Sequence, residues 1–278
     1  MAEVQEVEIA DIDKETAEKS IDPRLDEYTH QIYERFAKKF PEFTPEQLER
    51  LTGPSREEAS ERIKAEDSAD NDPLTDLPNK RGLYRAMDLR LQQYHREIKS
   101  GKKKDDIKAT FLYFDLDGLK TINDTYDHQT GDQVLSVFGQ LLQTSLRPTD
   151  LVGRLGGDEF AALVDASLEE AIEVGERVRE DLPQSFNDLF PKLNWPKSVS
   201  IGIRGLSNLN EEQLESEENR MALIKQSIHE ADIAHYQGAK HVGKNRIGVM
   251  LDNGQVQTAI VNVAGAVGQP PTISYGKP

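Results

Sequence analysis

The spacing of apolar residues divides the chain into segments of different character. Apolar side chains recur every three or four residues from Leu25 to Phe40, which predicts an amphipathic helix, and the Thr-Pro-Glu sequence at Thr44 is a typical start of a second, short helix. Residues 1–24 are acidic and show no sustained periodicity, so we expect them to be disordered. We interpret residues 25–70 as a helical accessory or dimerisation segment that ends in a polar linker.

Helical and strand-like patterns alternate between residues 71 and 250. Their order predicts one α/β domain in which a mainly antiparallel sheet is flanked by helices. Residues 251–278 end in a nearly uncharged stretch rich in glycine and proline, which we expect to be a flexible tail. Helices are predicted over residues 80–98, 131–146 and 220–237, and strands over 109–117, 150–155, 159–164 and 198–206.

Composition limits the kind of partner that the chain can bind. Its 278 residues include 50 acidic and 34 basic side chains, a formal net charge of -16. Such a surface repels phosphate backbones at long range, so we expect no nonspecific binding of nucleic acid. A local site with metal ions and a few lysines can still bind a small phosphorylated ligand. The chain has no cysteine, which excludes disulfides, thiolate metal sites and cysteine catalysis.

The sequence shows no sign of a membrane segment. No apolar run approaches the roughly 20 residues of a membrane span, and the first residues are acidic rather than basic and apolar. We therefore expect a soluble cytoplasmic protein that does not bind a membrane.

Acidic residues follow two of the predicted strands. Asp115 closes a strongly apolar strand, where a carboxylate loses hydration unless a cation or a hydrogen-bond donor meets it. Only one of Asp115 and Asp117 is expected to enter the same site, and Asp117 is equally well interpreted as a cap of the helix that begins near Gly118. Asp158 and Glu159 come directly after two glycines, a pattern that by itself favours a plain hairpin turn. The alternative is a metal-assisted phosphoryl-transfer site built from both acidic strand ends.

Several motifs together resemble one known family. The stretch "RLGGDEF" matches the signature of the GGDEF family of diguanylate cyclases. The stretches "DPLTDLPNKRGL", "FDLDGLKTINDTYDHQTGDQVL", "SVSIGI" and "AKHVGKNR" are similar to its other motifs and occur in the same order between residues 72 and 250. The resemblance implies a palm-like nucleotidyl cyclase fold and a role in bacterial second-messenger signalling.

The resemblance implies a metal and catalytic set at the two strand ends. Asp115, the Leu116 carbonyl, Asp158 and Glu159 match the family's ligands for Mg²⁺ or Mn²⁺, and Asp158 is also the candidate general base. Gly156 and Gly157 lack a β-carbon, so the main chain can approach a phosphate. Lys120 corresponds to a position near the phosphates, with a solvated helix face as the alternative interpretation.

The same resemblance implies that the substrate is GTP. Asn123 and Asp132 match the guanine-reading positions, and an amide with a carboxylate suits the donors of the guanine edge. His128 matches another substrate contact, with a helix-end cap as the alternative interpretation for both Asn123 and His128. Lys240 and Lys244 resemble the residues that bind the triphosphate.

One departure from the family pattern affects Lys240. The sequence "AHYQGAK" has one residue more than is usual between Tyr236 and Lys240, which in a continuous helix rotates everything that follows by about 100°. We expect either a bulge that absorbs the extra residue or an early end of the helix.

The implied activity is the condensation of two GTP molecules into cyclic di-GMP and two pyrophosphates, which requires a homodimer because each domain binds one GTP. Arg147 and Asp150, in "RPTD", match the family's inhibitory site for the product, whereas a surface salt pair in a turn is the simpler interpretation. The alternative function is a catalytically silent domain that acts as a receptor or scaffold for GTP or cyclic di-GMP.

Overall fold

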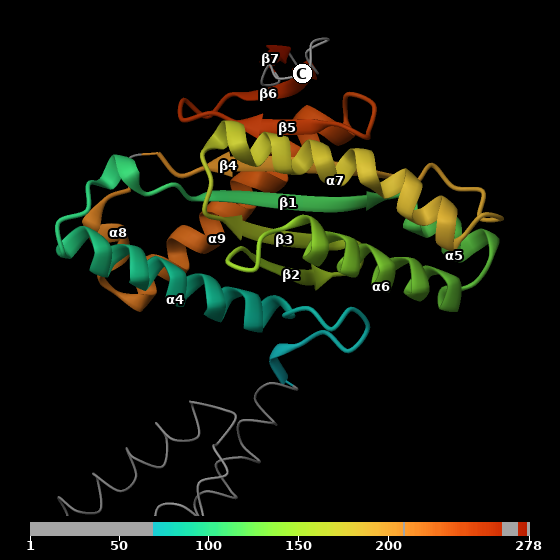
Figure 1. Cartoon of the computed structure of the whole chain (residues 1–278), viewed down its shortest axis with the longest axis horizontal. Helices are drawn as coiled ribbons and strands as arrows, with labels where there is room; N and C mark the ends of the chain where they lie inside the picture. Colours follow the sequence, from blue (N-terminus) through green and yellow to red (C-terminus); the bar gives the residue numbers. More distant parts are fainter. Residues whose placement is uncertain (1–68, 208, 263–271, 277–278) are drawn as a thin grey trace, which may run out of the picture. The chain divides into compact units, whose positions relative to one another are not determined.

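The computed structural model describes residues 69–207, 209–262 and 272–276 (Figure 1). The chain divides into two units between Ala69 and Asp70, and apart from Ala69 the described residues belong to the second. The predicted disordered segment 1–24 and almost all of the accessory segment 25–70 lie outside the described residues.

Helices and strands alternate along the described chain much as their sequence patterns predict. Side chains start several of the helices: Asn79 accepts hydrogen bonds from two backbone N–H groups of α4, and Ser167 and Glu170 form a capping box on α7. The helical elements are α4 (Lys80–Lys99), η1 (Lys104–Asp106), α5 (Leu119–Thr125), α6 (His128–Ser145), α7 (Leu168–Leu189), α8 (Glu211–Glu215), α9 (Glu217–Ala234) and the π-helix η2 (His235–Lys240). The strands are β1 (Thr110–Asp117), β2 (Leu151–Gly156), β3 (Glu159–Val164), β4 (Ser198–Gly205), β5 (Ile247–Met250), β6 (Val256–Asn262) and β7 (Thr272–Gly276).

The strands form one seven-stranded sheet in the order β2-β3-β1-β4-β5-β6-β7. Only β4 and β5 are parallel, and every other neighbouring pair is antiparallel. Helices cover the sheet on both faces (Figure 1). The predicted fold class, a mainly antiparallel sheet flanked by helices, is confirmed. No helix in the described part of the chain combines the length and the apolar character needed to cross a membrane.

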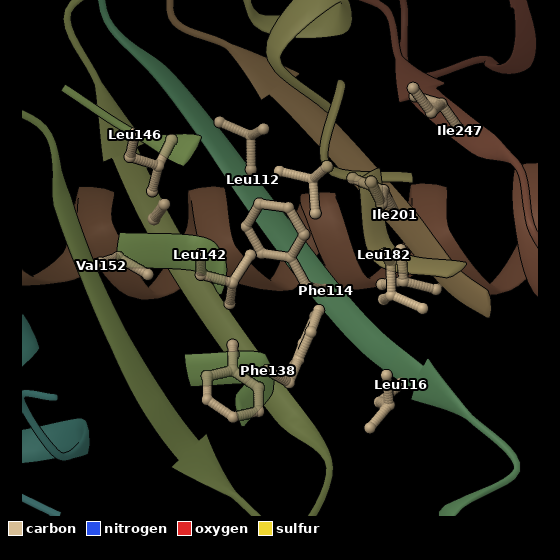
Figure 2. Close-up of a cluster of buried hydrophobic side chains, with 14 of the residues drawn as sticks. Leu112, Phe114, Leu116, Phe138, Leu142, Leu146, Val152, Leu182, Ile201 and Ile247 are labelled. Atoms are coloured by element: carbon tan, nitrogen blue, oxygen red, sulfur yellow. The ribbon is translucent and has the colours of Figure 1, made fainter. Parts of the chain in front are cut away.

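Two apolar layers hold the central strand β1, whose residues are all buried. Alternate side chains point to opposite faces of the sheet. Leu112, Phe114 and Leu116 therefore pack with residues of α6 and α7, as Figure 2 shows, and Phe111 and Tyr113 pack with residues of α4 and α9. This packing on both faces holds the carboxyl end of β1 rigidly, and it therefore fixes the positions of the polar residues that close the strand.

The flexible tail expected from residue 251 is not what the structure shows. Residues 256–262 and 272–276 form β6 and β7, which extend the sheet beyond β5. Glycine, proline and the lack of charge favour a flexible tail, but apolar and β-branched residues at alternate positions favour a strand, and Val256 and Thr258 among them are buried. The Thr258 hydroxyl also donates to the Gly238 carbonyl at 2.7 Å, which ties β6 to η2.

Candidate active site

The acidic strand end and the acidic hairpin meet at one edge of the sheet. In the antiparallel register of β1 and β3, Asp115 lies opposite Glu159. The Leu116 N–H donates to the Asp158 carbonyl at 3.2 Å. Since these residues come from strands separated by two helices in the sequence, the fold itself brings Asp115, Asp158 and Glu159 together. These are three of the four residues that the resemblance implies as metal ligands, and the fourth, Leu116, follows Asp115 in β1.

The two glycines form the turn that presents Asp158. Gly156 has a φ of 147° and Gly157 a φ of 55°, conformations that residues with a side chain rarely adopt. A β-carbon at either position would meet no atom within 4 Å, so the backbone conformation, and not space, requires glycine here. The open surface beside the turn also leaves the main chain accessible to a ligand.

Arg154 holds the turn in place from within the hairpin. Its guanidinium donates to the Gly157 carbonyl from Nε at 3.1 Å and from Nη2 at 2.8 Å. The third nitrogen, Nη1, contacts both carboxylate oxygens of Asp72 at 3.0 Å. Asp72 in turn accepts hydrogen bonds from the backbone N–H and the hydroxyl of Thr75. Arg154 therefore links the turn before α4 to the hairpin that carries Asp158.

Asp115 is a buried carboxylate with one close cation. Its side chain is 8% exposed, and the Lys240 ammonium lies 2.7 Å from Oδ2. Burial raises the pKa of Asp115, the Lys240 ammonium opposes this rise, and the nearby Asp158 carboxylate adds to it. His235 lies 3.9 Å from the same oxygen, but burial lowers the pKa of its imidazole. Lys240 is therefore the group that neutralises Asp115.

Asp117 does not cap the helix that follows it. Its carboxylate accepts hydrogen bonds from the Ser198 hydroxyl at 2.9 Å, from the Ser200 hydroxyl at 3.0 Å and from the Asn245 backbone N–H at 3.2 Å. Residues two apart in a strand share a face, so Asp115 and Asp117 point to the same side of β1. Asp115 is nevertheless the one of the two that pairs with Lys240. Asp117 fixes the loop that follows η2.

Asn123 is held at the corner between α5 and α6. Its Oδ1 atom is buried and has no hydrogen-bond partner among the described residues. A β-carbon on Gly131 would lie 1.9 Å from that oxygen, so glycine at this position is what allows the amide to sit there. Asp132 follows directly at the start of α6 and is exposed. A buried acceptor beside an exposed carboxylate is suited to a ligand edge that carries N–H donors.

The remaining basic candidates face solvent. Lys120, His128 and Lys244 are exposed, and none of them forms an ion pair within the part of the chain that the structure describes. Neither Asn123 nor His128 caps a helix. The α5 helix has Gly118 at its N-cap and no side-chain cap, and the Asp127 side chain caps α6 by accepting from the Thr130 N–H at 2.6 Å.

A π-helix accommodates the extra residue before Lys240. Residues 235–240 form η2, directly after α9, and the backbone N–H of His241 donates to the Tyr236 carbonyl at 2.9 Å, five residues earlier. Lys244 makes the same kind of bond to the Ala239 carbonyl at 3.0 Å. Of the two expected solutions, the structure adopts the bulge, and this places Lys240 against Asp115.

Comparison with known sequences decides the family. The profile described as "Diguanylate cyclase, GGDEF domain" matches residues 69–246, well over half of the chain. The chain belongs to the GGDEF domain family of diguanylate cyclases.

Individual members of the family show how far the likeness extends. The chain is 34% identical over 142 residues to the probable diguanylate cyclase DgcC of Escherichia coli K12, which covers 50% of this chain and 34% of DgcC. It is 31% identical over 181 residues to the probable diguanylate cyclase DgcT of the same organism, covering 64% of this chain and 35% of DgcT. The chain thus spans about a third of the length of these curated relatives.

A solved structure supports the fold. The coiled coil and GGDEF domain of DgcB from Caulobacter crescentus, determined in complex with c-di-GMP, aligns with a TM-score of 0.53 at 22% sequence identity. The alignment covers 73% of this chain and 96% of the other. At this identity the likeness concerns the fold of the GGDEF domain alone.

The residues at this edge of the GGDEF domain have the donor chemistry of a magnesium site. Asp115, Asp158 and Glu159 offer carboxylates, and Leu116 offers a carbonyl; hard oxygen ligands of this kind suit Mg²⁺ and Mn²⁺. In the ligand-free chain these donors do not yet surround a metal position. Among the described residues, no three or more acidic, histidine or cysteine side chains lie close enough together to hold a metal ion. The Lys240 ammonium lies where a metal ion would neutralise Asp115.

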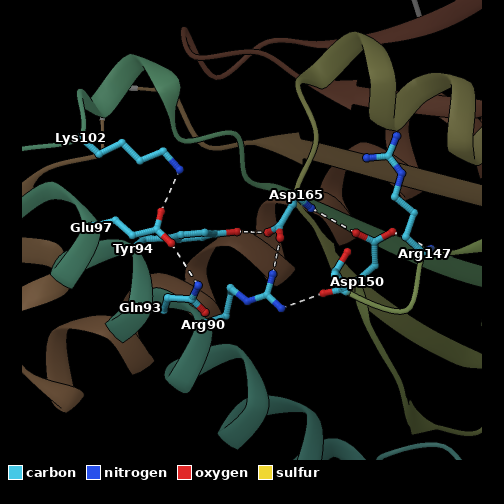
Figure 3. Close-up of polar contacts among 9 residues, drawn as sticks. Arg90, Gln93, Tyr94, Glu97, Lys102, Arg147, Asp150 and Asp165 are labelled. Carbon is cyan, nitrogen blue, oxygen red and sulfur yellow. Dashed lines mark hydrogen bonds and ion pairs between the residues drawn. The ribbon is translucent and has the colours of Figure 1, made fainter.

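The Arg147–Asp150 turn of the GGDEF domain contains no salt bridge between these two side chains. Asp150 instead accepts from the backbone N–H groups of Arg147 at 2.9 Å and of Asp165 at 3.3 Å (Figure 3). Arg90 bonds the Thr149 carbonyl at 2.8 Å and pairs with Asp165. The exposed Arg147 guanidinium remains available for a ligand beside a cavity of about 210 Å³.

The site contains residues that the sequence analysis did not single out. Arg154 and Asp72 lie within recognised motifs but gave no sign of their pairing, since residues 82 positions apart show no periodicity. His235 continues an apolar helical face, and its polarity was the one available signal. Its ring is buried, lies 5.3 Å from the Tyr113 ring, and neither of its nitrogens has a hydrogen bond among the described residues.

Proposed function

We propose that this chain is a diguanylate cyclase that condenses two molecules of GTP into cyclic di-GMP and two pyrophosphates. The observation that carries the proposal is the convergence of Asp115 with the Asp158–Glu159 hairpin at the end of β1. The buried and unpartnered Oδ1 of Asn123, on the helix that directly follows β1, supplies the second half of a nucleotide site.

The chain's own residues divide the work of binding and proton transfer. Asn123 and Asp132 accept hydrogen bonds from the N1 and N2 donors of guanine, which adenine does not present. Lys240 and Lys244 bind the triphosphate, with Lys120 as a further contact. Asp158 takes the proton from the ribose 3′-hydroxyl as that oxygen bonds to the α-phosphorus of the other GTP, and the bond to the β-phosphate oxygen breaks to release pyrophosphate.

Asp115, Asp158, Glu159 and the Leu116 carbonyl would hold Mg²⁺, which would neutralise charge on the phosphates and make the attacking hydroxyl more acidic. Because each site holds one GTP, two chains face each other during the reaction. The segment 25–70 contributes the dimer contact. Cyclic di-GMP binds at Arg147 and Asp150 and inhibits the enzyme, since the guanidinium can grip a phosphate or a guanine edge.

The proposal is tested with the purified protein, GTP and Mg²⁺, and chromatographic measurement of cyclic di-GMP. Asp158→Asn removes the base while keeping the size of the side chain, and it is expected to slow product formation by about 10²- to 10⁴-fold. Asp105→Asn, an exposed acid in η1, is the matched control and should leave the rate unchanged.

Two outcomes count against the proposal. Equal rates for Asp158→Asn and the wild-type chain would remove Asp158 from the mechanism. Tight binding of GTP with no turnover at high protein concentration would identify the domain as a nucleotide receptor instead.

A further inference from the structure

The Asp115–Lys240 pair poses a conflict for the proposed cyclase. Lys240 Nζ lies 2.7 Å from Asp115 Oδ2, and the side chains are 35% and 8% exposed. The proposed reaction assigns Asp115 to a metal ion and Lys240 to a triphosphate. A carboxylate oxygen already paired with an ammonium cannot take a divalent cation without placing two positive charges side by side. The pair and the metal-bound state are therefore alternatives.

The surroundings of the pair favour it in the ligand-free chain. Asp158 and Asp117 also attract the Lys240 ammonium. Conversely, the buried Asp115 needs a cation, and Lys240 is the one basic group within hydrogen-bond distance of its carboxylate among the described residues.

The π-helix is what aims Lys240 at Asp115. In a continuous α-helix the extra residue would turn Lys240 by about 100°, and the π-helix absorbs that residue so that Lys240 faces Asp115. The turn is anchored from inside, because Gly238 and Ala239 are buried and Gly238 packs against Gly248 of β5. Its position does not depend on Lys240 itself. The ammonium is thus presented to Asp115 by the fold, in a way that a flexible surface lysine would not be.

We propose that η2 holds Lys240 as a built-in counterion on Asp115, which keeps the metal position closed until the triphosphate of GTP draws the ammonium away. The inference rests on the proposed cyclase function and concerns the regulation of the same site. It couples the two ligands: a divalent cation binds weakly to the free chain and tightly once a triphosphate is present. The Lys240 ammonium thus keeps metal ions out of the site in the absence of substrate.

The test measures binding of Mn²⁺ to the full chain without nucleotide, by the loss of the free-ion signal in electron paramagnetic resonance. Lys240→Met removes the ammonium and keeps the length of the side chain, and it should tighten Mn²⁺ binding by about tenfold or more, the effect of losing one close charged hydrogen bond. Lys244→Met is the matched control, because it removes the same charge from a neighbouring exposed lysine. The control should change Mn²⁺ affinity by about twofold at most.

A second variant keeps the ammonium and its direction. Deletion of Gln237, an exposed residue of η2, removes the residue that the π-helix absorbs, and a continuous α-helix with the usual spacing then presents Lys240 in its present direction. It should leave Mn²⁺ binding as weak as in the wild-type chain. Addition of GTP should strengthen Mn²⁺ binding to the wild-type chain far more than to Lys240→Met.

The outcomes separate this inference from the proposed function. If Lys240→Met binds Mn²⁺ no more tightly than Lys244→Met, the counterion role is wrong, whether or not the wild-type chain makes cyclic di-GMP. If Lys240→Met binds Mn²⁺ tightly but the wild-type chain makes no cyclic di-GMP, the counterion role stands and the cyclase function falls.

Discussion

At the scale of single residues, the site is defined by polar atoms that are buried before any ligand arrives. The Asn123 Oδ1 atom is buried and has no hydrogen-bond partner among the described residues. A buried acceptor without a hydrogen bond costs about 1–3 kcal/mol of folding free energy. Gly131 creates the space for it, since a β-carbon there would lie 1.9 Å from the oxygen. The amide is therefore placed for a donor that the chain does not supply, which in the proposed function is the guanine edge.

Substitution of Asn123 tests this placement. Asn123→Ala should raise the KM for GTP by about tenfold or more, which corresponds to one lost hydrogen bond to a buried group. It should not lower the stability of the ligand-free chain, because the bond is unmade there. Gly131→Ala should reproduce the loss of GTP affinity with Asn123 still present, since the methyl group displaces the amide. Steady-state kinetics with GTP would contradict this account if both variants kept the wild-type KM.

The motifs predicted which residues carry the chemistry, but their partners required the fold. Asp115 could be selected from its local pattern, because a carboxylate that closes an apolar strand is unusual. Asp158 and Asn123 could be selected only through the resemblance to the GGDEF motifs. The pairing of Arg154 with Asp72, and of Asp117 with Ser198, joins segments about 80 residues apart, and no local pattern encodes such a contact. His235 was missed because helical periodicity describes its position as part of an apolar face.

At the scale of elements, the hairpin β2–β3 carries the acids and depends on one side chain to hold its turn. Arg154 donates hydrogen bonds from all three of its guanidinium nitrogens, to the Gly157 carbonyl and to the Asp72 carboxylate, and its side chain is 13% exposed. Ion pairs of this kind matter when they are desolvated and fully hydrogen-bonded, in contrast to exposed pairs.

Arg154→Ala should lower the free energy of unfolding by about 2 kcal/mol, because it leaves Asp72 without its cation and the Gly157 carbonyl without its donors. Arg154→Lys keeps the charge but loses the planar fork, and should recover only part of this loss. Arg81→Ala is the control: Arg81 pairs with Asp70 at 2.6 Å but is 63% exposed, so its loss should cost less than about 0.5 kcal/mol. Urea denaturation measures the free energy of unfolding of all three variants. Equal losses for Arg154→Ala and Arg81→Ala would refute the stabilising role of the Arg154 contacts with Asp72 and Gly157.

The pair of Arg154 and Asp72 also makes the stability of the chain depend on pH. Burial acts to raise the pKa of Asp72, but hydrogen bonds from Thr75 and Arg154 outweigh it and hold the pKa below its ordinary value of 3.8. A depressed folded-state pKa means that the stabilisation is present above pH 3.8 and is lost as the pH falls through the folded pKa. Asp72→Asn should be less stable than the wild type at pH 7, with a difference that shrinks below pH 3.8. A constant difference across that range would rule out an ionic contribution.

Several elements with strong periodicity could be predicted, but α7 (Leu168–Leu189) was not among the predicted helices, although its buried apolar residues recur at helical spacing. The helices α4, α6 and α9 and the strands β1 to β4 follow the expected ranges closely. Strands β6 and β7 were missed because their glycine- and proline-rich surroundings outweighed the alternation within them. The bulge in η2 was one of two expected solutions, and its contacts with β5 and β6 through Gly238 join segments that no local pattern relates.

At the scale of the whole molecule, the proposed reaction sets a requirement that one domain cannot meet. The net charge of -16 makes two copies of this chain repel each other at long range. The proposed dimer must overcome this repulsion through a local contact, and the segment 25–70 is the candidate from its apolar periodicity.

The rate of cyclic di-GMP formation per chain should therefore rise with protein concentration until the dimer is saturated. Moderate salt should shift this rise to lower concentrations, because it screens the repulsion between charges that lie more than a Debye length, about 8 Å, apart. Deletion of residues 1–68 should abolish the plateau at accessible concentrations. A per-chain rate independent of concentration in the deleted chain would exclude the segment as the dimer contact.

The central claim is tested most directly by the products of GTP turnover. Cyclic di-GMP and pyrophosphate are quantified over time in a reaction with purified chain, GTP and Mg²⁺, alongside an identical reaction with ATP. The account predicts one cyclic di-GMP for every two pyrophosphates from GTP, and no cyclic dinucleotide from ATP. GTP that remains intact at every protein concentration, or turnover of ATP at the same rate, would contradict it.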